Sequence, residues 1–191
     1  MKRRTAIGRI LVIGAGGGLL FSGYKWYDWN KKPDLTFLSG QQDLLTALAE
    51  TIIPATDTPG AKEAEVGSYI LLIIRDCTET KVQNKFIDGL KDLKSYSLSK
   101  YDKEYQQCTA SQQQQILRHF EEKGRPWGGI AGKIQTRYLG ATFFSTLKSL
   151  TVEGYCTSQA GATRALNYLA VPGRFQGCMP MLPGQTTWAT K

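Results

Sequence analysis

The stretch SGQQDLLTALAETIIP, residues 39–54, decides the fold class. Its apolar side chains recur at helical spacing, and one face of the predicted helix carries Leu44, Leu45, Leu48 and Ile52. Ser39 and Gln42 have the spacing of a capping box, which predicts the start of the helix, and Pro54 predicts its end. An amphipathic helix must bury its apolar face against other elements, so a packed helical domain is expected.

The same spacing continues towards the C-terminus and predicts further helices at residues 66–77, 82–93, 101–107, 109–120, 134–148 and 158–170. Thr109 and Gln112 form a second capping box, and Ser158 is the expected cap of the last helix. Val171-Pro172-Gly173 breaks that helix, and an irregular tail follows. No period-2 run and no internal repeat occur. These patterns predict an all-α domain of about six to seven helices.

The positive charge of the chain is concentrated at its N-terminus. Of 191 residues with a net charge of +8, residues 1–33 contain seven Lys or Arg and one acid, whereas residues 34–191 contain 17 bases and 15 acids. The body therefore lacks the electropositive surface that nucleic-acid binding requires. We predict two parts, an N-terminal targeting segment at 1–33 and an all-α domain at 34–191.

The first residues resemble an export signal. Arg3 and Arg4 precede an apolar run at residues 10–21, the pattern of a twin-arginine signal, which directs folded proteins across the membrane. No A-x-A cleavage site follows. Residues 24–32 instead alternate Trp and Tyr with Lys, a composition that suits a membrane–water interface. Two interpretations stay open: a membrane anchor that is retained, and a cleaved signal followed by an aromatic linker.

The glycine-rich run at residues 14–18 has an alternative interpretation as a dinucleotide-binding fingerprint. The G-x-G-x-x-G pattern fails because its last position, Leu19, is not glycine. No βαβ pattern follows either, since Trp26, Trp29 and Pro33 occupy the place of the helix. The run therefore does not predict a nucleotide site.

Residues of catalytic type are present, but not in catalytic patterns. The one histidine, His119, has no Ser, Cys or carboxylate partner nearby in sequence and is interpreted as structural. Asp57 fits an Asx-type turn, and Glu121 with Glu122 fits a solvated helix end. Trp127, in a loop rich in Gly and Pro, is a candidate interface residue. The sequence predicts no catalytic, cofactor-binding or metal-binding residue in this chain.

The cysteines leave three alternatives open. None of them forms a C-x-x-C pair, and in an exported protein they are compatible with intrachain disulfides, a covalent link to a partner, or free thiols. They are Cys77, Cys108, Cys156 and Cys178.

Two stretches carry a resemblance to a known family. Residues 52–64 read IIPATDTPGAKEA, and residues 151–158 read TVEGYCTS, followed by LNY, VPG and GC at 166–168, 171–173 and 177–178. Both resemble the gluconate 2-dehydrogenase subunit 3 family, over about residues 38–181. Cys156 stands where an aromatic residue is commoner in that family, and Cys108 belongs to no pattern of it.

The resemblance implies a non-catalytic small subunit of a membrane-associated sugar or polyol dehydrogenase. In such complexes a large flavoprotein of the glucose–methanol–choline type holds FAD, and a possible third subunit, a cytochrome, holds haem c. The small subunit bears the twin-arginine signal and is exported with the flavoprotein, so we expect a periplasmic protein attached to the inner membrane.

The candidate contacts with the flavoprotein are the loop around residues 56–60, the Trp127 loop and the region around Cys178. The loop residues in question are Thr56, Asp57, Thr58 and Pro59. The alternative is a stand-alone periplasmic sugar-binding or enzymatic protein, and a module that only tethers the complex is a third reading.

Overall fold

The computed structural model describes residues 30–125, 128, 140–171, 173–174, 177–178, 180–181 and 183–189. Its elements are the helices α2 (Leu35–Ser39), α3 (Gln42–Ile52), α4 (Val66–Asp76), α5 (Thr80–Tyr101), η1 (Tyr105–Gln107, a 3-10 helix), α6 (Ala110–Lys123), α8 (Phe143–Thr157) and η2 (Gly161–Ala165, a π-helix). No strand occurs among these residues, and one isolated bridge pairs Asn167 with Trp188. The predicted all-α class is confirmed.

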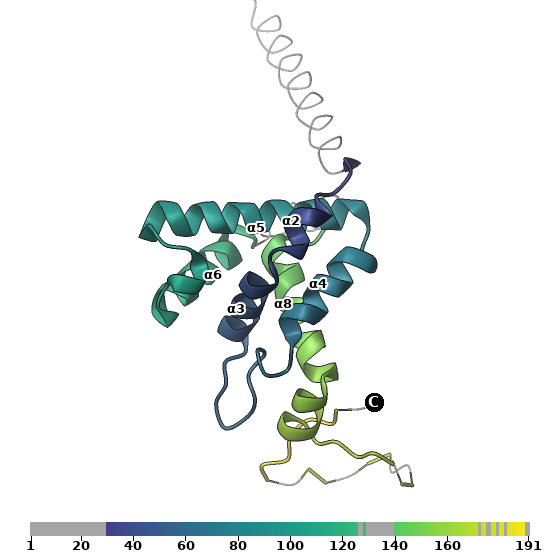
Figure 1. Cartoon of the computed structure of the whole chain (residues 1–191). Coiled ribbons are helices and arrows are strands. Elements are labelled where there is room, and N and C mark those ends of the chain that lie inside the picture. Colours follow the sequence, from purple (N-terminus) through teal and green to yellow (C-terminus); the bar gives the residue numbers. More distant parts are fainter. Residues whose placement is uncertain are drawn as a thin grey trace, which may run out of the picture.

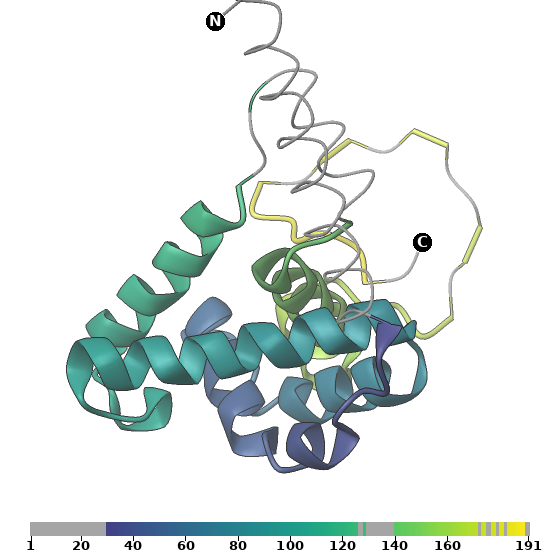
Figure 2. The same cartoon turned by 90° about the horizontal axis from the view of Figure 1, so that it is seen from above.

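The long helix α5 lies across one end of the body. In Figure 1 it runs along the top, while α3, α4 and α8 descend from it and α6 descends beside them. Figure 2, seen from above, shows α5 in front of these helices. Helix α4 packs against α3 and α8, and α8 also contacts α3, α5 and α6, so α8 is the element that the other helices share.

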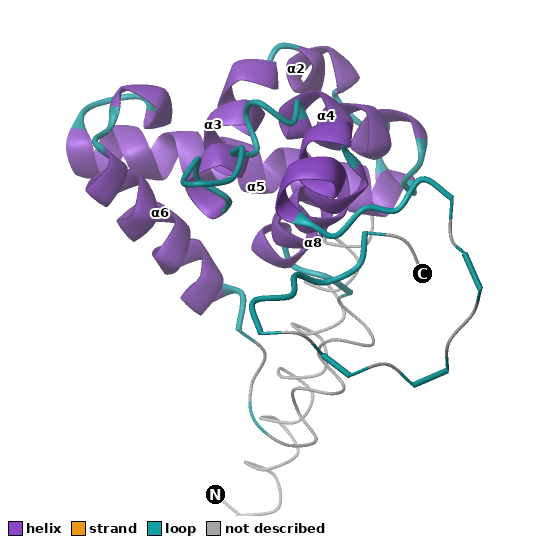
Figure 3. Cartoon of the chain, turned by 90° about the horizontal axis from the view of Figure 1, so that it is seen from below, coloured by secondary structure: helices purple, strands orange, loops and turns teal. Residues whose placement is uncertain are grey.

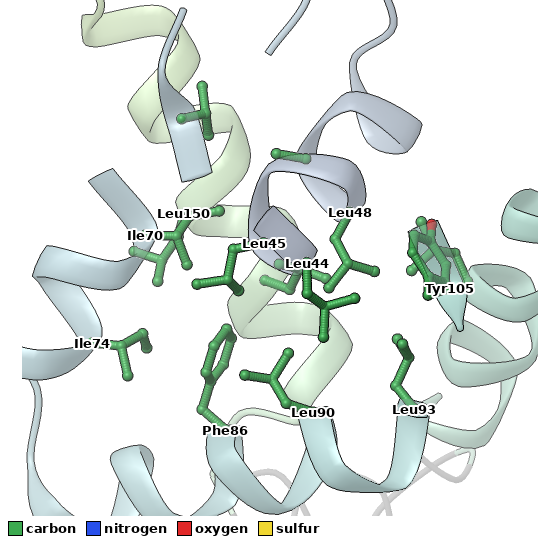
Figure 4. Close-up of a cluster of buried hydrophobic side chains, with 14 of the residues drawn as sticks. Leu44, Leu45, Leu48, Ile70, Ile74, Phe86, Leu90, Leu93, Tyr105 and Leu150 are labelled. Atoms are coloured by element: carbon green, nitrogen blue, oxygen red, sulfur yellow. The ribbon is translucent and has the colours of Figure 1, made fainter. Parts of the chain in front are cut away.

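The core forms where the apolar faces of these helices meet (Figure 4). Each fully buried Leu or Ile side chain contributes about 1.5–3 kcal/mol to folding. The core residues labelled in the figure are Leu44, Leu45, Leu48, Ile70, Ile74, Phe86, Leu90, Leu93, Tyr105 and Leu150. The face predicted for α3 is thus largely buried, although Ile52 at its end is only half-buried. The predicted face of α5 is buried in the same way at Phe86, Leu90 and Leu93. In α4 the prediction holds in part, because Val66 and Ile70 are buried but Cys77, at the end of the predicted face, is exposed.

Glycine permits the closest contact between α5 and α8. A Cβ atom built on Gly89 would lie 2.3 Å from Cγ of Phe143, at the start of α8. The Phe143 ring packs over this position, and its centroid is 5.2 Å from that of Phe86. A larger residue at 89 would push the two helices apart.

One predicted capping box is confirmed and one is wrong. The Thr109 hydroxyl accepts a hydrogen bond from the Gln112 N–H, and the Gln112 side chain accepts one from the Thr109 N–H. Ser39 instead ends the short helix α2, where its hydroxyl donates to the Leu35 carbonyl at 2.8 Å. The residue before α3 is Gln41, which makes no capping bond with its side chain.

The predicted helix at residues 134–148 is wrong over its middle. Gly140 has a φ of +72°, and α8 begins only at Phe143, after Thr142, whose hydroxyl accepts a hydrogen bond from the Ser145 N–H. The helix then continues to Thr157, well beyond the predicted end. Residues 134–139 lie outside the described part of the chain.

Two other predicted helices are shorter than expected. Ser158 does cap the next turn, because its hydroxyl accepts from the Gly161 N–H at 3.0 Å, but regular structure ends at Ala165 rather than at residue 170. Leu166 is extended, and the chain then pairs through Asn167 with the end of the tail. Of the predicted helix at 101–107, Tyr101 is the last residue of α5 and Tyr105–Gln107 forms the 3-10 turn η1.

Candidate partner-binding surface

The loop between α3 and α4 is held closed by one carboxylate. Glu50, in the last turns of α3, accepts hydrogen bonds from the Ala55 N–H at 3.1 Å and from the Lys62 N–H at 2.7 Å. The two bonds use different oxygens of the same side chain. A Cβ on Gly60 would lie 2.5 Å from the Glu50 Oε1, so glycine is required where the loop passes the carboxylate.

A second anchor comes from α8. The Tyr155 hydroxyl donates to the Pro59 carbonyl at 2.6 Å, and this bond is buried. On the surface nearby, Arg164 of η2 pairs with Glu63, near the end of the loop. These contacts tie the loop to the C-terminal end of α8 as well as to α3.

The anchors leave the tip of the loop exposed. Thr56 and Asp57 are exposed and Thr58 is half-buried, and the Thr56 N–H donates to the Thr58 carbonyl at 3.0 Å. Pro59 is buried, so it forms the base of the loop and does not offer its ring to a partner in this structure. Of the four predicted loop contacts, Thr56 and Asp57 are therefore the ones that the structure exposes.

The Asx-type turn interpreted at Asp57 does not form within the described part of the chain. The carboxylate that accepts backbone N–H groups of this loop is that of Glu50, from the preceding helix. The Asp57 carboxylate consequently stays on the surface.

The tail that follows η2 returns to its own beginning. The Asn167 N–H donates to the Thr187 carbonyl at 2.8 Å, and the Ala189 N–H donates to the Asn167 carbonyl at 3.0 Å. The tail carries a set of large exposed apolar side chains: Tyr168, Leu169, Val171, Met181 and Trp188. Cys178, the centre of the third candidate contact region, is also exposed.

Three other predicted residues lie outside the described part of the chain. These are Arg3 and Arg4 of the targeting segment and Trp127 of the second candidate contact loop. Among the described residues, no helix has both the length and the apolar content needed to cross a bilayer.

His119 packs as a structural histidine would. Its ring stacks on Tyr96 of α5, with centroids 4.3 Å apart and planes 2° from parallel, and meets Phe120 edge-on. Glu121 and Glu122 are exposed on α6, and Glu121 lies 3.6 Å from the Lys148 ammonium. Neither position assembles an acid–base pair.

The largest pKa shift belongs to the core. Burial raises the pKa of Tyr105, whose hydroxyl donates to Thr51 at 2.9 Å. Burial also lowers the pKa of Lys85 on α5, with a smaller contribution from Lys81. Shifted groups mark functional sites when they line a cleft, but Tyr105 is enclosed by packed helices. No three His, Cys, Asp or Glu side chains in the described residues come together as a metal site.

All four cysteines are free thiols in the structure. Cys77 and Cys178 are exposed, Cys156 is half-buried on α8, and Cys108 is buried. The Cys108 sulfur lies 3.5 Å from both the Ser97 hydroxyl and the Glu104 carbonyl.

Sequence reasoning missed the two residues that hold the loop. Tyr155 lies inside the second of the two stretches that carry the family resemblance, and Glu50 lies just before the first. The available signal was a carboxylate placed between the apolar positions of a helix and immediately before a turn-rich loop.

The structure is that of a small all-α protein. It exposes the tip of the loop between α3 and α4 (residues 53–65), which we call the anchored loop, and an apolar tail. The chain belongs to the gluconate 2-dehydrogenase subunit 3 family, whose pattern it matches over residues 39–173. Neither the curated proteins nor the solved structures that were searched gave a match. The family is by its name a subunit of a dehydrogenase.

Proposed function

We propose that this chain is the non-catalytic small subunit of an FAD-dependent sugar or polyol dehydrogenase, which binds the large flavoprotein subunit and accompanies it during export. The observation that carries the proposal is the family match over residues 39–173. The anchored loop supports it, because a surface fixed before binding loses little conformational freedom when a partner docks.

The cofactors belong to the partners in this proposal. FAD sits in the large subunit, of the glucose–methanol–choline type, and a cytochrome subunit with haem c accepts the electrons where one is present. This chain contributes contact surface, with Thr56, Asp57 and Thr58 at the tip of the loop. Trp127 and the region around Cys178 are the other proposed contacts.

The export role rests on Arg3 and Arg4. A flavoprotein folds around FAD before it leaves the cytoplasm, so only a route for folded cargo can carry it. A large subunit without a signal of its own then depends on the signal of its small partner. The complex would lie in the periplasm, attached to the inner membrane.

The export role is tested by co-expressing the chain with the flavoprotein encoded beside it and measuring flavin-containing dehydrogenase in the periplasm. We expect replacement of Arg3 and Arg4 by Lys, or deletion of residues 1–33, to leave the flavoprotein in the cytoplasm. Replacing Arg9 by Lys is the matched control and should leave export unchanged. Normal export of the flavoprotein after the deletion would refute the escort role.

The binding role has a separate test on the loop. Asp57→Arg should weaken capture of the flavoprotein by a tagged small subunit, because it reverses the charge at the exposed tip. Glu122→Arg makes the same charge change on α6 and should have no effect. Purified alone, the chain should neither hold flavin nor oxidise sugars, and turnover by the lone chain would favour the stand-alone alternative.

A further inference from the structure

The two ends of the helical body carry different segments of the chain. Helix α8 joins them, because Phe143 packs against Phe86 of α5 at one end and Tyr155 bonds to Pro59 at the other. At about 1.5 Å of rise per residue, this stretch of helix spans about 18 Å. Figure 1 shows α5 at one end, with the loop between α3 and α4 and the tail at the opposite end.

The N-terminal segment joins the body at the α5 end. The Asn84 side chain of α5 donates to the Lys31 carbonyl at 2.7 Å, and Lys91 of α5 lies 3.7 Å from the Asp34 carboxylate. Residues 31–34 are therefore docked on α5, so the described part of the chain joins the body at this end.

The tail at the other end is apolar, exposed and nearly uncharged. Val171 and Met181 keep 80% and 85% of their surface exposed. Among residues 166–191, Arg174 and Lys191 are the only charged residues, and none is acidic. Large apolar side chains gathered on a surface mark a place where another molecule binds.

The backbone pairing of Asn167 with Thr187 and Ala189 closes residues 168–187 into a loop, which we call the tail loop. An isolated backbone bridge of this kind is only marginally stable in water. Arg164 of η2, just before the tail loop, pairs with Glu63 near the end of the anchored loop, so the start of the tail loop lies on the same side of the body as the end of the anchored loop. Figure 3 shows both on the side of the molecule away from α5.

We infer that the tail loop docks on the large flavoprotein subunit as a second contact beside the tip of the anchored loop, leaving the α5 end free for the N-terminal segment. The inference rests on the proposed function, because it takes the flavoprotein as the partner. Binding buries Val171 and Met181 in an apolar surface of that subunit, and the two backbone bonds at Asn167 hold the two ends of the tail loop together.

Two features favour the flavoprotein over a membrane as the occupant. The tail loop has too few basic residues to attract anionic headgroups. The N-terminal segment, the expected membrane attachment, also enters at the opposite end of α8. A second copy of this chain is a remaining occupant, and the test separates it.

The test measures the affinity of the purified small subunit for the flavoprotein by titration calorimetry. Replacing both Val171 and Met181 by Asp should weaken binding at least about thirtyfold, since apolar anchors at an interface carry most of its affinity. The control replaces Leu72 of α4 and Val152 of α8 by Asp, at positions 49% and 45% exposed on the body. The control should change the affinity less than about threefold, and circular dichroism should show native helix in both variants.

A second variant leaves every tail side chain except one unchanged. Ala189→Pro removes the N–H that donates to the Asn167 carbonyl. The loss of this closing bond should weaken binding about tenfold, because the loop must then be ordered at the moment of docking.

The outcomes separate the inference from the proposed function. If the unmodified chain binds the flavoprotein and the Val171/Met181 variant binds equally well, the inference is wrong and the proposed function stands. If the unmodified chain does not bind the flavoprotein, the proposed function itself fails. If the unmodified chain instead self-associates in sedimentation, or binds vesicles of anionic lipid, and the Val171/Met181 variant does not, the tail loop binds a second copy or a membrane. The inference is then overturned.

Discussion

The Tyr155 hydroxyl donates a buried hydrogen bond of 2.6 Å to the Pro59 carbonyl, across 96 positions of the sequence. Each residue lies in one of the two stretches that resemble the family, residues 52–64 and 151–158. The bond therefore joins the two stretches into one structural unit. The family pattern describes a loop together with the helix end that holds it.

Tyr155→Phe removes this bond and leaves the aromatic ring in place. We expect a loss of about 1–2 kcal/mol in the free energy of unfolding, because the Pro59 carbonyl stays buried without its donor. Urea unfolding followed by circular dichroism measures the loss.

Tyr101→Phe is the matched control for that variant. The Tyr101 hydroxyl donates to the Gln115 side chain at 2.8 Å, but on the surface, where water can replace it. Its removal should cost less than about 0.5 kcal/mol. An equal loss in both variants would contradict the anchoring role of Tyr155.

Glu50→Ala should destabilise the loop between α3 and α4 more than Glu50→Gln. The alanine variant removes the acceptor of both the Ala55 and the Lys62 N–H, whereas glutamine keeps one carbonyl oxygen. We expect losses of about 2–3 and about 1 kcal/mol respectively. Amide hydrogen exchange should show faster exchange at Ala55 and Lys62 in the alanine variant, and Glu122→Ala should leave both rates unchanged.

The helices that sequence reasoning placed correctly are those with a continuous apolar face. Leu44, Leu45 and Leu48 in α3 are all buried, as the spacing predicts, and Ile70 of α4 is buried with them. Burial of such a face dominates the energetics of a helix in a folded protein, so the face is visible in the sequence alone.

The errors occur where a polar side chain had more than one possible partner. The Ser39 hydroxyl bonds to a carbonyl within α2, so its spacing from Gln42 was not a cap. The roles of Glu50 and Tyr155 depend on atoms brought together only by the tertiary fold. The position of Glu50 before a turn-rich loop was a local signal, but the sequence does not show that its partners are the Ala55 and Lys62 N–H groups or that Tyr155 bonds to Pro59.

Gly89→Ala should destabilise the protein through the contact between α5 and α8. The added methyl would lie 2.3 Å from Cγ of Phe143, so the ring or the whole helix must shift. We expect a loss of about 1–3 kcal/mol, although alanine favours a helix over glycine.

Gly40→Ala is the control for crowding, at a position just after α2. Its added methyl would meet the Phe37 carbonyl at 3.5 Å, an ordinary contact distance, and the φ of Gly40 is −79°. Thermal unfolding should show little change for this variant. If Gly89→Ala were equally neutral, the close packing of α5 on α8 would be wrong.

Tyr105 should make the protein less stable at alkaline pH. Burial raises the pKa of Tyr105 above its ordinary value of 10.0. Above about pH 10 the unfolded chain releases this proton while the folded chain keeps it, so stability falls as the pH rises, by up to about 1.4 kcal/mol per pH unit. Below about pH 10 both states keep the proton, and this contribution to stability is retained in full.

Tyr105→Phe removes the titrating group, so its stability should fall less between about pH 8 and about pH 11 than that of the unmodified protein. Its stability at the lower pH should be about 1 kcal/mol smaller, because the bond to Thr51 is lost. The lowered pKa of Lys85 acts in the opposite direction, but equally in both proteins. Tyr101→Phe, which also removes a tyrosine hydroxyl but one whose bond lies on the surface, is the control for the general effect of such a substitution on stability. Parallel pH profiles for Tyr105→Phe and the unmodified protein would contradict the burial of this hydroxyl.

The cysteines should differ in reactivity according to their burial. With a thiol reagent such as dithionitrobenzoate under native conditions, Cys77 and Cys178 should react first, because both are exposed, and half-buried Cys156 more slowly. Buried Cys108 should react only as the protein unfolds, since packed helices and the contacts with Ser97 and Glu104 enclose its sulfur. Peptide mass mapping of the labelled protein assigns each rate to its residue. In denaturant without reductant all four thiols should be titrated, and a smaller number would mean that two of them pair as a disulfide, which would overturn the free-thiol state in favour of the intrachain bridge that the sequence left open.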